Sequence, residues 1–292
     1  GFHHPRDRSF FHPPENKTAP DALPEALLPL DYTELPDTDS LYEADGPIPQ
    51  AEQAAARLFG VKRTLFSSGG CTLCIQTMLR LALAGSRKII AGRVLHKSAV
   101  NAMALLDLHP IWVLPRPDAG PELAGRIHPD DIEDALRRHP DAAAVYLTSP
   151  DYYGVLSDVS SISRVCRTFG VPLLVDNAHG AHLRFTSQNL HPASLGASIT
   201  CCSAHKTLPV LTGGAYLNIT EDRFVEGAKS VMGLFGSTSP SYPVMASLDL
   251  CRAWLEDNGK NAYPPLENRI SSLRKQALER GIHLPGGQTE PT

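Results

Sequence analysis

Short apolar runs alternate with segments of helical pattern between Thr64 and Ile219, and this alternation limits the fold more than any other feature. Short apolar runs indicate buried strands, whereas apolar residues at intervals of three and four indicate helices. Strands are expected at residues 64–66, 88–91, 111–114, 142–147, 173–176, 197–202 and about 213–217, with helices at 50–59, 73–84, 98–106, 130–138 and 160–169. This order predicts an α/β three-layer sandwich with a mostly parallel central sheet, whose ligands bind beyond the carboxyl ends of the strands.

The composition argues against several classes of partner. A net charge of -4 does not favour nucleic acid, and 42% hydrophobic residues suffice for a sizeable core. No apolar run is long enough to span a membrane and no signal peptide is recognised, so a cytoplasmic protein is expected. No metal site is expected, because the histidines near the amino terminus fit no common ligand spacing. The pair Cys71-x-x-Cys74 is either a redox pair or packing at the start of a helix.

A lysine and an aspartate follow two neighbouring strands. Asp176 ends the run at 173–176, and Lys206 follows the next run, within Ser203-Ala204-His205-Lys206-Thr207. A partly desolvated lysine can bond covalently to an aldehyde, and an acid can keep a pyridine nitrogen protonated, which are the two groups that pyridoxal phosphate needs. Ser203 and His205 are donors of the kind that bind a phosphate. The simpler alternatives are a solvated surface lysine at Lys206 and a helix cap at Asp176.

A glycine-containing loop at residues 67–72 joins the first strand to the next helix. Such a loop presents backbone N–H groups at the positive end of a helix, which makes Gly70, Cys71 and Thr72 candidates for binding a phosphate. The loop has neither a dinucleotide-binding nor a Walker pattern, so a nucleotide is not favoured.

Two motifs together resemble one family. Ser-x-His-Lys-x-Leu-Pro at 203–209 and Asp-x-Ala-His-Gly-Ala-His at 176–182 resemble the Orn/Lys/Arg decarboxylases of fold type I, and the resemblance extends from about Asp31 to about Glu256. It implies pyridoxal 5'-phosphate as cofactor, with Lys206, Asp176 and His96 as catalytic residues. Lys206 is then bonded to the aldehyde, Asp176 faces the ring nitrogen and His96 stacks on the ring, although without the resemblance His96 is more typical of a helix start. The implied cofactor-binding residues are Gly70, Cys71, Thr72, His96, Asp176, Ala178, His179, Ser203, His205 and Lys206.

The resemblance also implies an activity. The expected reaction is decarboxylation of a basic L-amino acid (lysine, ornithine or arginine) to the amine and carbon dioxide, as in polyamine biosynthesis. Relatives carry hydroxyl side chains where Gly70 and Cys71 stand, so some side-chain donors to the phosphate are lost here, with Thr72 in a position to compensate. Two alternatives remain open. One is another fold-type-I enzyme, such as an aminotransferase or a lyase, and the other is a cofactor-binding remnant without turnover.

The expected organisation has three parts. Residues 1–60 form an irregular arm and a first helix, residues 61–256 form the cofactor-binding large domain, and residues 257–292 begin a truncated carboxyl-terminal region. The small carboxyl-terminal domain of the family is therefore expected to be missing or truncated, and Phe2–Arg8 departs from the element with which the family begins. The segment at 235–242 resembles one that contacts the cofactor phosphate of a partner subunit, which implies a homodimer or higher homo-oligomer, although a helix cap explains it equally well.

Overall fold

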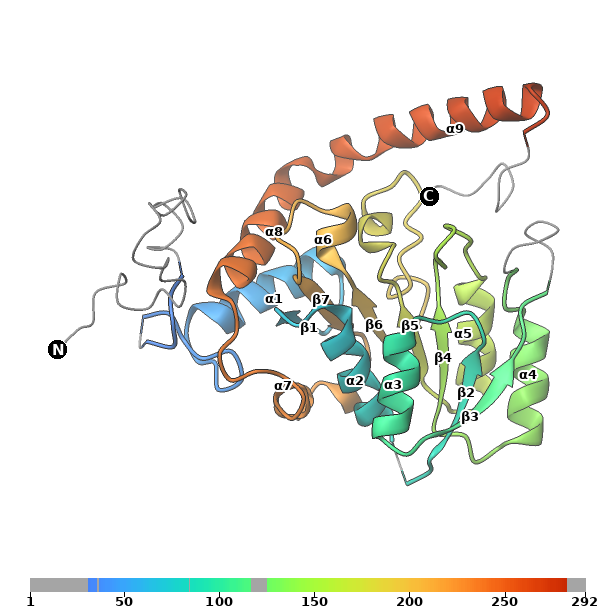
Figure 1. The fold of residues 1–292 in the computed structure, drawn as a ribbon, viewed down its shortest axis with the longest axis horizontal. Coiled ribbons are helices and arrows are strands. Elements are labelled where there is room, and N and C mark those ends of the chain that lie inside the picture. Colours follow the sequence, from blue (N-terminus) through green and yellow to red (C-terminus); the bar gives the residue numbers. More distant parts are fainter. Residues whose placement is uncertain (1–30, 36, 84, 117–124, 283–292) are drawn as a thin grey trace, which may run out of the picture.

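A seven-stranded sheet with the order β1-β7-β6-β5-β4-β2-β3 forms the centre of the molecule (Figure 1). The computed structural model describes residues 31–35, 37–83, 85–116 and 125–282, so the predicted arm at 1–30 and the chain end after 282 lie outside the described residues. The strands are β1 (Arg63–Ser67), β2 (Lys88–Gly92), β3 (His109–Val113), β4 (Ala144–Thr148), β5 (Leu173–Asp176), β6 (Ile199–Cys202) and β7 (Ala215–Ile219). Strand β7 is antiparallel to β1 and β6, and the other neighbouring pairs are parallel. The expected mostly parallel sheet is therefore confirmed.

Helices cover both faces of this sheet, as the three-layer prediction requires. One layer contains α2 (Gly70–Ala82), α3 (Lys97–Leu105) and α7 (Ala228–Gly233), which pack on one continuous apolar cluster. The opposite layer contains α4 (Pro129–Arg138) and α5 (Val159–Thr168) at one end and α1 (Pro47–Phe59) and α8 (Tyr242–Ala262) at the other. The central strands are buried on both faces, which explains why their sequences are nearly continuous apolar runs.

Three elements differ from the sequence-based expectation. Helix α2 begins at Gly70, three residues before the predicted start, because Gly69 already acts as its N-cap. Lys206 lies on a short helix, α6 (Ala204–Thr207), which the sequence pattern did not predict. The predicted domain boundary at 256/257 falls inside α8, and the division into regions stays a prediction.

The last described helix, α9 (Pro264–Glu279), lies outside the three layers (Figure 1). None of its residues is buried, although its first turns border a pocket described below. Among the described residues, no helix combines the length and apolarity needed to cross a bilayer. The six cysteines are free and buried, so Cys71 and Cys74 form no disulfide here.

A buried ion pair attaches two helices to the edge strand β1. Glu52 of α1 accepts hydrogen bonds from the Phe66 backbone N–H at 2.9 Å and from Lys229 Nζ of α7 at 2.5 Å. Burial raises the pKa of Glu52 and lowers that of Lys229, and each charge opposes the shift of the other. The pair therefore satisfies an N–H group at the open edge of the sheet and fixes α1 against the layer of α2.

Removing one partner of this pair is expected to destabilise the fold. Lys229→Met leaves the Glu52 carboxylate buried without its cation, so the free energy of unfolding in urea should fall by about 3 kcal/mol. The double variant Glu52→Gln/Lys229→Met keeps an acceptor for the Phe66 N–H and removes both charges, and should recover most of that loss. An unchanged stability in Lys229→Met would contradict this role of the pair.

Candidate active site

Strand alternation brings Tyr146, Asp176 and Cys201 to one face of the sheet. Cys201 of β6 is the register partner of Asp176 of β5, and Tyr146 of β4 pairs with Leu174, two residues before Asp176. Side chains of register partners and of residues two apart point to the same face of a sheet. These three side chains therefore face the layer of α2 at the carboxyl end of β5, where the sequence places Asp176.

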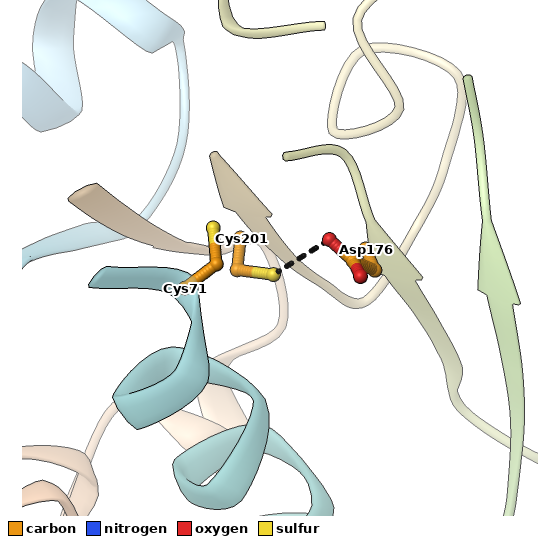
Figure 2. Close-up of side chains that lie close together, drawn as sticks. All are labelled: Cys71, Asp176 and Cys201. Carbon is orange, nitrogen blue, oxygen red and sulfur yellow. Dashed lines mark hydrogen bonds between the residues drawn. The ribbon is translucent and has the colours of Figure 1, made fainter. Parts of the chain in front are cut away.

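Asp176 is a buried carboxylate that accepts three hydrogen bonds, of which Figure 2 shows the one from Cys201. It is 1% exposed. Its Oδ1 atom accepts from the Ala178 N–H at 3.1 Å and from the Cys201 thiol at 3.5 Å, and its Oδ2 atom accepts from the Tyr146 hydroxyl at 3.3 Å. Burial raises the pKa of Asp176, and the hydrogen bonds from Ala178 and Cys201, together with the nearby histidine side chains, oppose that rise. Among the ion pairs of the described residues, none includes this carboxylate.

Cys71, Cys201 and Asp176 form a compact cluster beneath this edge. Their ligating atoms lie within 4.8 Å of one another, close enough for one metal ion to bind all three (Figure 2). Metal ions bind the thiolate form of cysteine, whereas burial raises the pKa of the Cys201 thiol well above its ordinary value. The protonated Cys201 thiol donates to Asp176, so the cluster acts as a hydrogen-bonding environment for the carboxylate.

Lys206 is paired with a histidine of the predicted set. Lys206 Nζ lies 2.9 Å from His179 Nε2, and His179 Nδ1 lies 3.2 Å from the Asp151 carbonyl oxygen. Because a carbonyl only accepts, Nδ1 carries the proton, and Nε2 accepts a hydrogen bond from Lys206. Burial and the charge of Lys206 lower the pKa of His179, which keeps its ring neutral near neutral pH.

Gly180 allows the turn that places His179 next to Lys206. A Cβ atom at position 180 would lie 2.1 Å from Asn177 Oδ1 and 2.8 Å from Pro150, so a larger residue does not fit without displacement. The short helix η3 (Ala181–Arg184) follows at once. The sequence His-Gly after the Asp176 strand is therefore explained by close packing of this turn.

The loop before α2 has a different donor set from the one expected. The Gly70 N–H donates to the Gly213 carbonyl at 2.8 Å, and the φ of +65° at Gly70 favours glycine. The Cys71 side chain is buried within the cluster described above, whereas Thr72 is exposed. Donors that are available for a phosphate here include the backbone N–H groups of α2 that follow Gly70 and the Thr72 hydroxyl.

The remaining predicted residues lie around the same edge of the sheet. His96 is exposed and caps α3, with Nδ1 accepting from the Ser98 N–H at 3.2 Å. His205 Nδ1 lies 3.0 Å from the Gly214 carbonyl, and Ser203 is buried as the N-cap of α6. Their roles toward a cofactor stay predictions.

Sequence reasoning missed Tyr146, Cys201 and Asp151. All three lie in or directly after strands that were predicted, but the register of neighbouring strands was unknown. With the register, the alternation of side chains would have placed Tyr146 and Cys201 on the face of Asp176. Asp151 acts through its backbone carbonyl, for which a sequence carries no signal.

Comparison with known proteins identifies the family. A family model described as "Orn/Lys/Arg decarboxylase, major domain" matches residues 3–284. The chain belongs to the Orn/Lys/Arg decarboxylase family. It is 33% identical to an arginine decarboxylase of Bacillus subtilis (strain 168) over 271 residues, which are 90% of this chain and 54% of that protein. It is also 36% identical to the uncharacterized protein YaaO of the same organism over 241 residues, covering 80% of this chain and 49% of YaaO.

A solved decarboxylase structure shares the fold. Lysine decarboxylase A from Pseudomonas aeruginosa superposes with a TM-score of 0.76 at 21% identity, over 86% of this chain and 37% of that chain. The described residues thus share the fold of that lysine decarboxylase over the matched region. The chain spans about half the length of the curated relatives that it matches.

A buried histidine, His191, lies next to the end of β6, the strand that precedes the lysine segment. His191 is fully buried, with Nε2 lying 3.1 Å from the Cys202 thiol at the end of β6 and its ring packed on Phe59. Burial, together with the neighbouring Arg184 and His182 side chains, lowers the pKa of His191 to about 3. The ring is therefore neutral in the folded chain over the whole physiological range.

The neutral His191 is expected to make the fold sensitive to acid. In the unfolded chain His191 has its ordinary pKa of 6.5 and binds a proton below that pH, whereas in the folded chain its pKa is about 3. The contribution of His191 to the free energy of unfolding is fully present above its pKa in the unfolded chain. It is lost as the pH falls, by about 2 kcal/mol between about pH 7.5 and about pH 5. The difference in urea unfolding free energy between the two pH values should shrink by that amount in His191→Gln. The exposed control His109→Gln should behave as wild type, and an equal slope in His191→Gln would contradict the assignment.

Proposed function

We propose that this chain binds pyridoxal phosphate and contributes the catalytic lysine of a decarboxylase for basic L-amino acids. The observation that carries the proposal is the position of Asp176, a buried carboxylate with no ion pair among the described residues, at the sheet edge where Lys206 pairs with His179. A buried charge is costly unless a partner compensates it. A protonated pyridine nitrogen is a partner of the required charge and shape.

The residues at this edge fit the three parts of the cofactor. Lys206 would hold the aldehyde carbon and Asp176 the ring nitrogen. Backbone N–H groups at the start of α2 and the Thr72 hydroxyl would hold the phosphate, helped by the positive end of a helix. His96 would cover the ring. When bound, the cofactor accepts the electrons that remain on the substrate carbon as carbon dioxide leaves.

The chain itself controls the proton on Lys206. A lysine amine is nucleophilic only after it loses a proton. His179 is neutral and accepts a hydrogen bond from Lys206 through Nε2, so it is placed to receive that proton. Asp151 holds the opposite ring nitrogen and thereby keeps Nε2 directed at Lys206. We therefore assign His179 the role of holding and moving the proton at Nζ.

The names of the relatives support a basic amino acid as substrate. The matched proteins include arginine decarboxylases and lysine decarboxylases. The proposal for this chain includes an amine product of the kind that enters polyamine synthesis. The proposal includes a small-molecule substrate, a cytoplasmic location and a homodimer. The dimer is proposed on the resemblance of residues 235–242 to the segment that contacts a partner's cofactor.

The lysine assignment predicts a covalent complex. Wild-type chain mixed with pyridoxal phosphate should develop a visible absorption band, and after reduction with borohydride its mass should increase by one cofactor. Lys206→Ala should show neither change, because the amine that bonds to the aldehyde is absent. Lys275→Ala, which removes an exposed lysine from α9, should behave as wild type.

A persistent band and mass increase in Lys206→Ala would overturn the assignment. Release of carbon dioxide from lysine, ornithine and arginine should then be measured with the loaded wild-type chain. A product that keeps the carboxylate of the amino-acid substrate would favour an aminotransferase or lyase reaction on the same residues.

A further inference from the structure

A pocket of about 340 Å³ opens beside the Lys206–His179 pair, between η3, α6 and the first turns of α9. One wall is apolar and consists of Tyr263, Leu266 and Ile270. The volume lies within the usual range for small-molecule sites, roughly 300 to 1,000 Å³. The wall is suited to an aliphatic chain.

Glu267, His182 and Thr207 present acceptor atoms around this pocket. Glu267 Oε2 accepts from the Ser187 N–H at 2.8 Å and from the Ser187 hydroxyl at 2.7 Å. Within the described part of the chain, no hydrogen bond reaches Glu267 Oε1 and no ion pair includes Glu267. His182 Nδ1 and Thr207 Oγ1 are buried and have no hydrogen-bond partner among the described residues. A ligand that fits this set must donate hydrogen bonds and carry positive charge.

His182 contributes a lone pair at neutral pH. Burial lowers the pKa of His182 to about 4, against a smaller opposing effect of the Glu267 carboxylate. Its ring is therefore uncharged in the folded chain and does not itself neutralise Glu267. The pocket keeps one negative charge and at least two unpaired acceptor atoms.

The pocket is connected directly to the lysine segment. Thr207 follows Lys206 in the chain, and His179 both lines the pocket and contacts Lys206 Nζ. The Tyr263 hydroxyl donates to the Thr207 carbonyl at 3.2 Å, and the Tyr263 ring stacks on His182 with centroids 5.9 Å apart. A molecule bonded near Lys206 could thus extend a side chain into this pocket.

We infer that this pocket is the subsite for the distal cation of a basic amino acid, with Glu267 as its counter-ion. The aliphatic stem of the substrate packs on Tyr263, Leu266 and Ile270, and the ammonium or guanidinium end donates to Glu267, His182 and Thr207. This inference rests on the proposed function for its substrate class. It adds a specificity-determining residue on α9, outside the motifs that identify the family.

The test compares a cation with its neutral isostere. Butylguanidinium carries the stem and the charge, whereas butylurea has the same shape without the charge, and neither is an amino acid. Their binding to the chain, with and without pyridoxal phosphate, should be measured by ligand-observed NMR titration. Wild type should bind butylguanidinium, and Glu267→Gln should weaken this binding at least about tenfold, because a hydrogen bond to a charged group is lost. Binding of butylurea should be weak and equal in both.

Two control variants separate this role from a structural one. Glu279→Gln removes the same charge from the far end of α9 and should bind butylguanidinium as wild type does. Ser187→Ala removes the hydroxyl that holds Glu267 but keeps the carboxylate, and should retain most of the binding. An equal loss for both ligands in Glu267→Gln, no loss at all, or no binding of butylguanidinium to wild type would overturn the inference.

The two proposals fail in different ways. If wild type forms no visible band with pyridoxal phosphate but still discriminates the two ligands through Glu267, the decarboxylase proposal fails and the cation subsite stands. If the band forms and Glu267→Gln discriminates as wild type does, the subsite fails and the decarboxylase proposal stands.

Discussion

The buried carboxylate of Asp176 is the interaction on which the proposed site depends. It lies at the end of a central strand, faces the layer of α2, and receives hydrogen bonds from both flanking strands. These donors are neutral, so they orient the carboxylate without neutralising it. A cationic partner would stabilise the ionised form of a carboxylate held in this way. The parallel order of β4, β5 and β6 makes this arrangement possible, because it brings the carboxyl ends of the strands to one edge.

The lysine side of the site is organised by backbone contacts. The Asp151 carbonyl fixes the tautomer of His179, and His179 in turn orients Lys206. The Tyr263 hydroxyl bonds the carbonyl of Thr207 and so connects the lysine helix to the junction of α8 and α9. Helix α9 buries no residue, yet its first turns complete a pocket next to the lysine. The segment of Lys206 and Thr207 therefore contributes both the candidate catalytic amine and part of the pocket lining.

The sequence predicted the layers and the position of the candidate site, but not its inner contacts. Apolar runs identified each strand, and the polar residues after them marked the ligand edge. The antiparallel direction of β7 and the strand order depend on long-range pairing, which a local pattern does not contain. Position 71 was predicted from its place in the phosphate loop, whereas the early start of α2 turns the Cys71 side chain inward. Tyr146 read as an ordinary core residue because only the register shows that its hydroxyl meets Asp176.

The most direct measurement is the titration of the Asp176 carboxyl group, followed by carbon-13 NMR in aspartate-labelled protein and assigned with Asp176→Asn. In the cofactor-free chain the account predicts a midpoint above the ordinary value of 3.8, because burial disfavours the charged form more than its neutral donors stabilise it. Addition of pyridoxal phosphate should lower that midpoint, as a positively charged ring nitrogen compensates the carboxylate. A midpoint at or below 3.8 in the cofactor-free chain, or no response to the cofactor, would contradict the account.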